Sequence, residues 1–242
     1  MTALTIAPVP GLPELREGDD LARLIAESAE LLDGDVLVVA QKAISKIEGR
    51  VVRLDDVEAT AQARAIAGEG DPRRIEVILS EAKRIVRSRG SLLIAETRHG
   101  FICASSGVDA SNAPAPGMLV LLPVDPDASA DRLRARLREL TGRELGVLIS
   151  DSFGRPWRQG TTDVAIGAAG VEVLRDLKGA RDPTGYELKS TVIAIVDESA
   201  GAAQLGIGQL DRAPVASVRG LDVRGDGRAR DLVMPEERNL FS

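Results

Sequence analysis

The chain has 242 residues, of which 44% are hydrophobic, and its 31 basic and 37 acidic side chains leave a formal net charge of -6. A chain of this length and composition can bury a hydrophobic core without disulfides or structural metals. Its excess of acidic side chains provides no general electrostatic attraction for nucleic acid or an anionic membrane. The single cysteine, Cys103, excludes an internal disulfide, and the single histidine, His99, excludes most histidine-based catalytic and zinc sites.

The first elements in the chain are a predicted helix and a predicted strand. Apolar residues recur at helical spacing over residues 21–32, behind the acidic pair Asp19 and Asp20, and indicate an amphipathic helix. The run DVLVVA at residues 35–40 is branched and apolar on both faces, which predicts a strand buried in a sheet. Residues 41–50 are expected to form a loop after it.

A second helical pattern covers residues 73–87, where the apolar side chains share one face. Residues 91–97 and 100–107 then predict two strands of a hairpin, and residues 119–123 predict another strand. His99 lies in the polar turn of this hairpin, so we expect an exposed turn residue rather than a catalytic group.

The second half of the chain continues the alternation of helices and strands. Residues 126–140 predict a helix capped by Asp127 or Ser129, and residues 144–152 predict a buried strand with a polar end. Further strands are expected at residues 162–170, 191–200 and 213–220. The pattern predicts an α/β fold with a mixed sheet. Residues 223–242 are polar and are expected to form a loosely held tail.

No GxxxxGK[ST] or GxGxxG loop occurs, so a nucleotide would be held by turn amides, lysines and carboxylates that bind Mg²⁺ or Mn²⁺. The first cluster of this kind is GVDASN, where Asp109 and Asn112 follow an apolar strand. Its alternative is an Asx turn that satisfies only its own backbone.

The second cluster is ISDSFGRPWRQG, in which a buried strand delivers Asp151 and Ser152 to its C-terminal end. Open α/β sheets bind ligands at that end. Together with Arg155 and Arg158 these side chains suit a metal bridged to a polyphosphate. The alternative is a helix-capping aspartate followed by solvated arginines.

Weaker candidates lie at other turns. Lys42 and Lys46 follow the first buried strand and either contact phosphate or are only solvated. Gly208 and Gln209 belong to a glycine-containing loop that either meets a ligand or is a plain turn. Glu198 is a candidate base, with the cap of a strand end as the simpler interpretation.

Seven motifs occur in a characteristic order: GLPELREGDD, DGDVLVVAQKAISKIEGR, GVDASN, LLPVDPDASA, GVLISDSFGRPWRQG, VAIGAAG and PVASVRGLDV. Over residues 9–223 the chain thereby resembles the coenzyme F420-0:L-glutamate ligase family. The resemblance implies a GTP-dependent enzyme of coenzyme F420 biosynthesis, and the single cysteine fits a reducing, cytoplasmic location. The enzyme would add L-glutamate to F420-0 to give F420-1 and extend a γ-linked glutamate tail. The resemblance also implies Mg²⁺ or Mn²⁺, help from K⁺, and an intertwined homodimer.

The resemblance also assigns site residues. The GTP-binding set would be Gly11, Leu12, Pro13, Glu14, Gln41, Lys42, Lys46, Asn112, Gly208 and Gln209. The divalent metals would be held by Asp109, Asp151, Ser152 and Gln209, with Ser152 standing where the family often has threonine. Asp109, Asp151 and Lys46 would carry catalysis by holding metal and neutralising charge.

The same resemblance predicts a ligase domain over residues 1–222. Residues 223–242 would then be a tail, or a linker toward the flavin-binding C-terminal domain that similar bacterial sequences carry. The reaction is expected to pass through an acyl phosphate. Two other classes remain open: a metal-dependent phosphohydrolase with water as the attacking group, and a non-catalytic nucleotide-binding module that partners a flavin enzyme.

Overall fold

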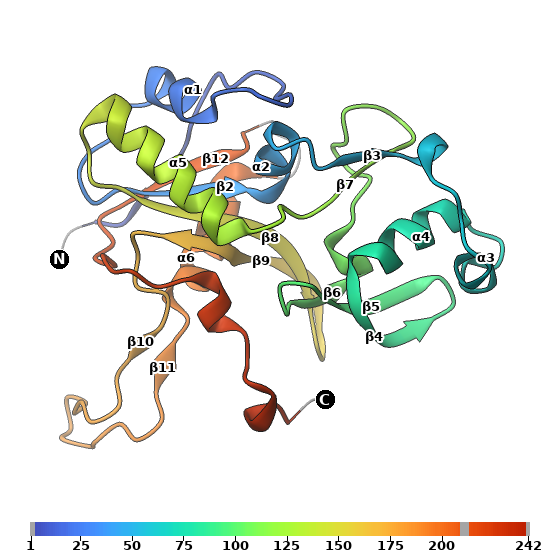
Figure 1. Ribbon diagram of the computed structural model, residues 1–242. Helices are drawn as coiled ribbons and strands as arrows, with labels where there is room; N and C mark the ends of the chain where they lie inside the picture. Colours follow the sequence, from blue (N-terminus) through green and yellow to red (C-terminus); the bar gives the residue numbers. More distant parts are fainter. Residues whose placement is uncertain (1–2, 209–212, 241–242) are drawn as a thin grey trace.

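A computed structural model describes residues 3–208 and 213–240 of the chain (Figure 1). The strands are β1 (Thr5–Pro8), β2 (Val36–Ala40), β3 (Val51–Arg53), β4 (Ala82–Arg89), β5 (Leu92–Thr97), β6 (Ile102–Ala104), β7 (Met118–Val120), β8 (Gly146–Arg155), β9 (Arg158–Ala169), β10 (Arg175–Asp176), β11 (Val192–Ile193) and β12 (Val215–Arg219). The α-helices are α1 (Leu21–Ser28), α2 (Gln41–Ile47), α3 (Ala61–Ala67), α4 (Pro72–Glu81), α5 (Pro126–Thr141) and α6 (Ile195–Ile207). The described residues also form the short 3₁₀ helices η1 (Leu54–Asp56), η2 (Ser105–Gly107), η3 (Ala229–Leu232) and η4 (Glu236–Arg238).

A five-stranded mixed sheet, in the order β1-β12-β2-β8-β9, forms the centre of the fold. In this sheet β2 and β8 pair in parallel, whereas the pairs β1–β12, β12–β2 and β8–β9 are antiparallel. Helices α1 and α5 cover one face and α6 the other (Figure 1), so the sheet separates two apolar cores. The predicted α/β fold with a mixed sheet is confirmed.

A smaller lobe lies to the right in Figure 1 and is inserted between β3 and β7. It consists of α3, α4 and the antiparallel sheet β4-β5-β6, with its own core around Ile75, Ile78 and Leu93. The predicted hairpin is present as β5 and β6. The helix expected over residues 73–87 ends at Glu81, because the following residues pair with β5 as strand β4.

Two other predicted elements are wrong. Residues 41–47, expected as a loop, form α2 directly after β2. Residues 195–200, expected as a strand, begin the helix α6. Val196, Ala200, Ala203 and Ile207 are buried along one side of α6, so packing against the sheet favours the helix.

The start of α5 also differs from the prediction. The capping side chain is Asp125, whose carboxylate accepts a hydrogen bond from the Ala128 amide at 3.0 Å, and not Asp127 or Ser129. Asp127 is buried instead and binds backbone amides of β9 and of the C-terminal segment. The C-terminal segment was expected to be loosely held, but its part up to η3 packs against the sheet, because Ala229 is buried in the second core. A domain boundary at residue 222 stays a prediction.

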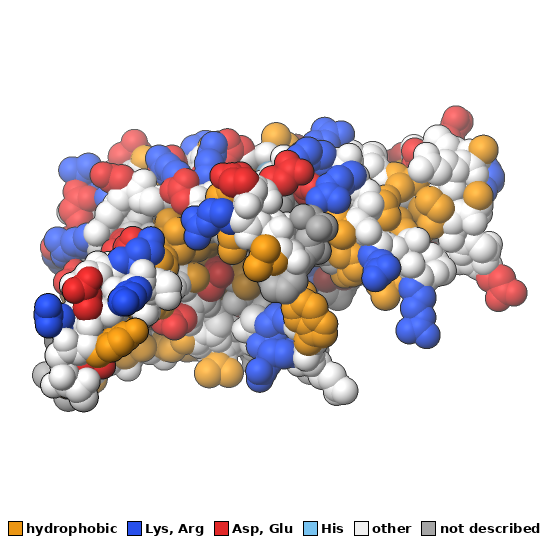
Figure 2. All heavy atoms as spheres, turned by 90° about the horizontal axis from the view of Figure 1, so that it is seen from below, with side chains coloured by type: hydrophobic (Ala, Val, Ile, Leu, Met, Phe, Trp, Pro, Cys, Tyr) orange, Lys and Arg blue, Asp and Glu red, His pale blue; other side chains and the backbone are white. Residues whose placement is uncertain are grey.

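On the face seen in Figure 2, acidic and basic side chains are interspersed, with apolar side chains between them. No helix within residues 3–208 and 213–240 is long and apolar enough to cross a membrane.

Candidate functional site

Several predicted site residues lie near the C-terminal end of β2, beside the parallel strand β8. Ala40, the last residue of β2, pairs with Ser150 of β8. Beyond this pair the chain of β2 leaves the sheet, whereas β8 stays paired with β9 as far as Arg155, so Asp151 and Ser152 lie within the strand and not at its predicted end. One segment continues into α2 with Lys42 and Lys46, and the other carries Asp151. The C-terminal edge of parallel strands is where open sheets bind ligands.

Lys42 connects this edge to the turn that holds Asp109. Its ammonium group donates hydrogen bonds to Asp109 Oδ2 at 2.6 Å and to the hydroxyl of Ser111. Asp109 also accepts from the amide and the hydroxyl of Ser111, at 2.8 and 2.7 Å. Burial alone would raise the pKa of Asp109, but the hydrogen bonds from Lys42 and Ser111 hold it below its usual value. Asp109 is therefore an oriented anion, in an Asx turn that also faces Lys42.

Asp151 has the opposite electrostatic character. Burial raises the pKa of Asp151 to about 7, and repulsion from Asp163 and Asp109 adds to the rise. The hydrogen bond from the Ser152 amide and the positive charge of Lys42 lower the pKa, but by less than burial raises it. The charges of Asp109, Asp151 and Lys42 thus act on one another, although they come from three separate segments. A cluster of this kind, with one strongly perturbed carboxyl, is typical of functional sites.

The raised pKa of Asp151 leads to a stability prediction. Because that pKa is about 7 in the fold and 3.8 for an ordinary aspartate, the folded state retains a proton that the unfolded chain has already lost between these values. The free energy of unfolding therefore falls as the pH rises through this window. In EDTA, Asp151→Asn is expected to raise the free energy of unfolding by about 1–2 kcal/mol near pH ~8. This gain is smaller than the full pKa shift would give, because the side chain is partly exposed to solvent. Near pH ~4 the substitution should leave the free energy of unfolding almost unchanged. Guanidinium denaturation at both pH values measures the gain, and an equal gain at both would contradict the electrostatic cause.

The carboxylates fit a hard divalent cation. Mg²⁺ usually binds one or two carboxylates and completes its shell with water and phosphate oxygens, and Asp109 and Asp151 supply two. Among residues 3–208 and 213–240, no group of three or more His, Cys, Asp or Glu is placed to hold a metal. Substrate oxygens would therefore have to complete the shell. Gln209, the fourth predicted metal ligand, lies outside the described residues.

Ser152 is held by a residue that the sequence analysis did not single out. Its hydroxyl donates to Asp163 Oδ1 at 2.6 Å, across the β8–β9 ladder. Alternate residues of a strand point to opposite sides, so the Ser152 side chain projects away from that of Asp151. Metal binding by Ser152 stays a prediction. The sequence signal that could have identified Asp163 is an acidic residue within the otherwise apolar strand predicted at residues 162–170.

One of the predicted nucleotide-binding segments, the loop at residues 11–14, lies beside α2. Lys46 forms an ion pair with Glu14, which ties the loop at residues 11–14 to α2. Within this loop Leu12 packs against the first core, and Gly11 has a φ of 71° that favours glycine. The ion pair therefore places this loop beside Lys46.

Gln41 differs, because its amide is buried. It donates to Ser45 Oγ at 2.6 Å and to the Leu121 carbonyl at 2.8 Å, so it anchors α2. Asn112 is exposed with a φ of 53°, and Gly208 ends α6.

His99 and Glu198 have structural positions. His99 is half-buried and not exposed as expected, because its ring stacks on Phe101 with centroids 5.6 Å apart. Its Nε2 lies 2.9 Å from the Pro123 carbonyl, which orients the ring within the lobe. Glu198 is exposed in the first turn of α6, and it does not cap a strand end.

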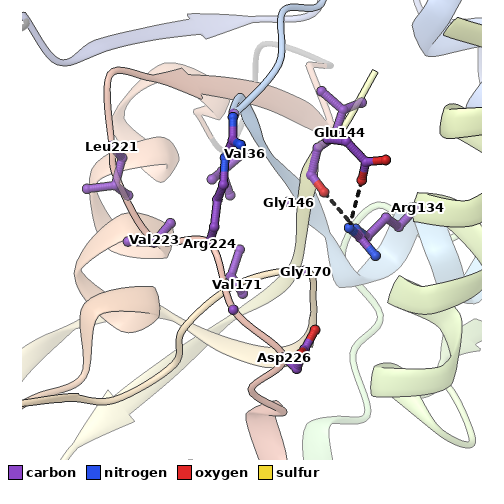
Figure 3. A pocket seen from close by; sticks show the side chains of 13 residues that line it. Val36, Arg134, Glu144, Gly146, Gly170, Val171, Leu221, Val223, Arg224 and Asp226 are labelled. Atoms are coloured by element: carbon purple, nitrogen blue, oxygen red, sulfur yellow. Dashed lines mark hydrogen bonds and ion pairs between the residues drawn. The ribbon is translucent and has the colours of Figure 1, made fainter. Parts of the chain in front are cut away.

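A cavity of about 360 Å³ lies elsewhere, at the edge where β2 and β8 begin (Figure 3). Val36, Gly146 and Val171 line it, together with Arg134, whose guanidinium donates to the Leu145 carbonyl at 2.7 Å. Of the predicted site residues that the structure describes, none lines this cavity. It is therefore separate from the candidate site.

Comparisons with known proteins agree along the whole chain. The sequence model of the F420-0:Gamma-glutamyl ligase family matches residues 11–220. Three similar proteins are named coenzyme F420:L-glutamate ligase. The one from Methanopyrus kandleri is 48% identical over 249 residues, covering 100% of this chain and 98% of its own. Those from Methanocaldococcus jannaschii and Methanothermobacter thermautotrophicus are 43% and 41% identical, covering 95% and 98% of this chain and 94% and 98% of their own.

Proposed function

Because the chain belongs to the F420-0:gamma-glutamyl ligase family, we propose that it joins L-glutamate to coenzyme F420-0 and consumes GTP in doing so. Extension from F420-1 by a second γ-linked glutamate belongs to the same proposal. The observation that carries it is the meeting of Asp109, Asp151 and Lys42 beyond the C-terminal end of β2, beside β8. Two carboxylates and an ammonium group suit a polyphosphate held by a divalent cation.

In the proposed reaction a carboxylate oxygen of F420-0 attacks the γ-phosphorus of GTP, and the bond to the β-phosphate oxygen breaks to release GDP. The amine of glutamate then attacks the carbonyl carbon of the acyl phosphate, loses a proton and displaces inorganic phosphate. Lys42 and Lys46 would neutralise charge on the triphosphate. The residue that takes the proton of the amine is unassigned.

Asp109 and Asp151 would hold Mg²⁺ or Mn²⁺, with K⁺ as a further ion of the proposal. When bound, the divalent metal supplies charge neutralisation between two anions, the attacking carboxylate and the triphosphate. The fit rests on the donor set, since hard cations prefer carboxylate oxygens. Gln209 and Ser152 remain proposed ligands.

A homodimer is also part of the proposal. The hairpin of β8 and β9 extends beyond the sheet, and Trp157 near its tip is 83% exposed. Large exposed aromatic side chains are typical of interfaces between chains. A flavin-binding domain in a longer chain and a cytoplasmic location also remain proposals.

The proposed activity is tested by incubating the protein with F420-0, GTP, Mn²⁺ and L-glutamate, followed by mass spectrometry of the deazaflavin. We expect a product that carries added glutamate, with one GDP formed for each amide bond. A metal-dependent phosphohydrolase would instead consume GTP equally with and without glutamate. A regulatory module would bind GTP without any turnover, and either result would contradict the ligase assignment.

A further inference from the structure

Arg50 joins three parts of the chain that lie far apart in the sequence. Its amide donates to the Ser45 carbonyl of α2 at 2.7 Å, and its carbonyl accepts from the Leu121 amide at 3.0 Å. Its guanidinium group donates to the Leu122 carbonyl at 2.9 Å and to Glu81 Oε2 at 2.7 Å. Arg50 therefore connects α2, the end of α4 and the strand that continues from β7.

The ion pair between Arg50 and Glu81 links the inserted lobe to the part of the chain that carries α2. Arg50 lies just before β3, where the chain enters the lobe, and Glu81 is the last residue of α4 within the lobe. In Figure 1, β3 and β7 run between α2 and the lobe. Both side chains of the pair are partly buried, with 23% of Arg50 and 16% of Glu81 exposed. Solvent therefore screens their attraction less than that of a pair on the open surface.

The strand that continues from β7 also holds Asp109. Val120 exchanges two backbone hydrogen bonds with Asp109, at 3.0 and 2.8 Å, and Leu121, which Arg50 binds, follows directly. The end of β7 thus lies between β3 and the backbone of Asp109. The side chain of Asp109 in turn accepts from Lys42 of α2 at 2.6 Å. A shift of this strand relative to α2 would therefore change the distance between Asp109 and Lys42.

We propose that Arg50 is a positioning residue, which fixes the strand that continues from β7 against α2, so that Asp109 meets Lys42 and the divalent cation of the reaction. This inference rests on the proposed function, in which Asp109 holds metal. It assigns no contact between Arg50 and the metal or a substrate. The alternative is that Arg50 and Glu81 only stabilise the attachment of the lobe.

The test compares Arg50→Met with the matched control Arg84→Met. Methionine keeps a flexible, unbranched apolar side chain and removes the guanidinium group. Arg84 donates to Glu96 at 2.6 Å between β4 and β5, so the control removes an ion pair that lies within the lobe. Mn²⁺ is titrated in the presence of a non-hydrolysable GTP analogue, and the electron paramagnetic resonance signal of the free ion is followed.

Arg50→Met is expected to weaken Mn²⁺ binding about tenfold or more, the usual loss when a group that orients a metal ligand is removed. Arg84→Met should stay within about twofold of the wild type, because it leaves the contacts of Arg50 intact. Glu81→Gln removes the ion pair but keeps the hydrogen bond from Arg50 to Leu122. Its loss of Mn²⁺ affinity should therefore lie between those of the other two variants.

Hydrogen exchange without metal or nucleotide gives a second measurement. The backbone amides of Asp109 and Val120 bind each other's carbonyls, so they report whether the strand still holds Asp109. They are expected to exchange faster in Arg50→Met than in the wild type, and at the wild-type rate in Arg84→Met.

The outcomes separate a positioning role from a purely structural one. If Arg50→Met lowers the denaturation midpoint but leaves the Mn²⁺ affinity within about twofold of the wild type, the positioning role is wrong. An equal loss of Mn²⁺ affinity in Arg84→Met also overturns it, because the effect would then follow from any weakening of the lobe. Should Arg50→Met fail to fold, Glu81→Gln decides, and unchanged Mn²⁺ affinity in it overturns the inference. Failure of the wild-type protein to form an amide product would overturn the ligase activity, whereas neither measurement needs turnover.

Discussion

Asp109→Asn and Asp151→Asn are each expected to reduce the rate of amide formation on the order of 100-fold or more. Asparagine keeps the shape of the side chain and removes the negative charge that the divalent cation needs. Charge stabilisation by a bound metal contributes several kcal/mol, and each ~1.4 kcal/mol is a factor of ten in rate. The measurement is the initial rate of glutamate addition at saturating GTP and Mn²⁺.

The controls for this prediction separate chemistry from folding. Circular dichroism should show an intact fold in both variants, because neither carboxylate holds core elements together. Ser111→Ala is the matched control for Asp109, since it removes the neighbouring hydroxyl but keeps the ion pair of Asp109 with Lys42. We expect this control to lose less than about tenfold in rate. Near-normal turnover in both aspartate variants would contradict the assignment of the site.

The sequence predicted the centre of the fold because its strands are buried on both faces. The sequences of β2 and of the first half of β8 are apolar at every position and do not alternate with polar residues. Such a continuous apolar run is typical of a strand whose two faces are both covered by helices. The polar ends of the two runs then pointed to Asp151, Lys42 and Lys46 as neighbours. That Asp109 joins them depends on the inserted lobe, whose position on the sheet no local pattern encodes.

The errors have local causes. No side chain caps α2 at Ala40, so nothing in the sequence marked its start. Apolar spacing of 3.6 residues continues through Val86, but hydrogen bonding to β5 turns that stretch into β4. The β-branched residues before α6 favoured a strand, whereas burial of alanines further on decided for a helix. Asp163 gains its meaning only from the β8–β9 register.

Asp127→Ala is expected to lower the free energy of unfolding by about 3–5 kcal/mol, the usual cost of breaking a buried charged network. Asp127 is 4% exposed, and its Oδ1 accepts from the amides of Ala168 at 2.9 Å and Ala229 at 2.8 Å. Its Oδ2 accepts from Arg230 Nε at 2.9 Å. Alanine would leave both amides buried without an acceptor. Urea denaturation followed by circular dichroism measures the loss.

The control for this change is the neighbouring cap. Asp125→Ala removes the hydrogen bond to Ala128 at the start of α5 and should cost about 1 kcal/mol, as for other capping residues. The difference between the two variants arises because Asp127 joins three parts of the chain: α5, β9 and the C-terminal segment with η3. Hydrogen exchange of the Ala229 amide should therefore speed up in Asp127→Ala and stay slow in Asp125→Ala. Equal losses of stability in both variants would mean that Asp127 contributes only to the helix end, and that the C-terminal segment is held by its apolar contacts alone.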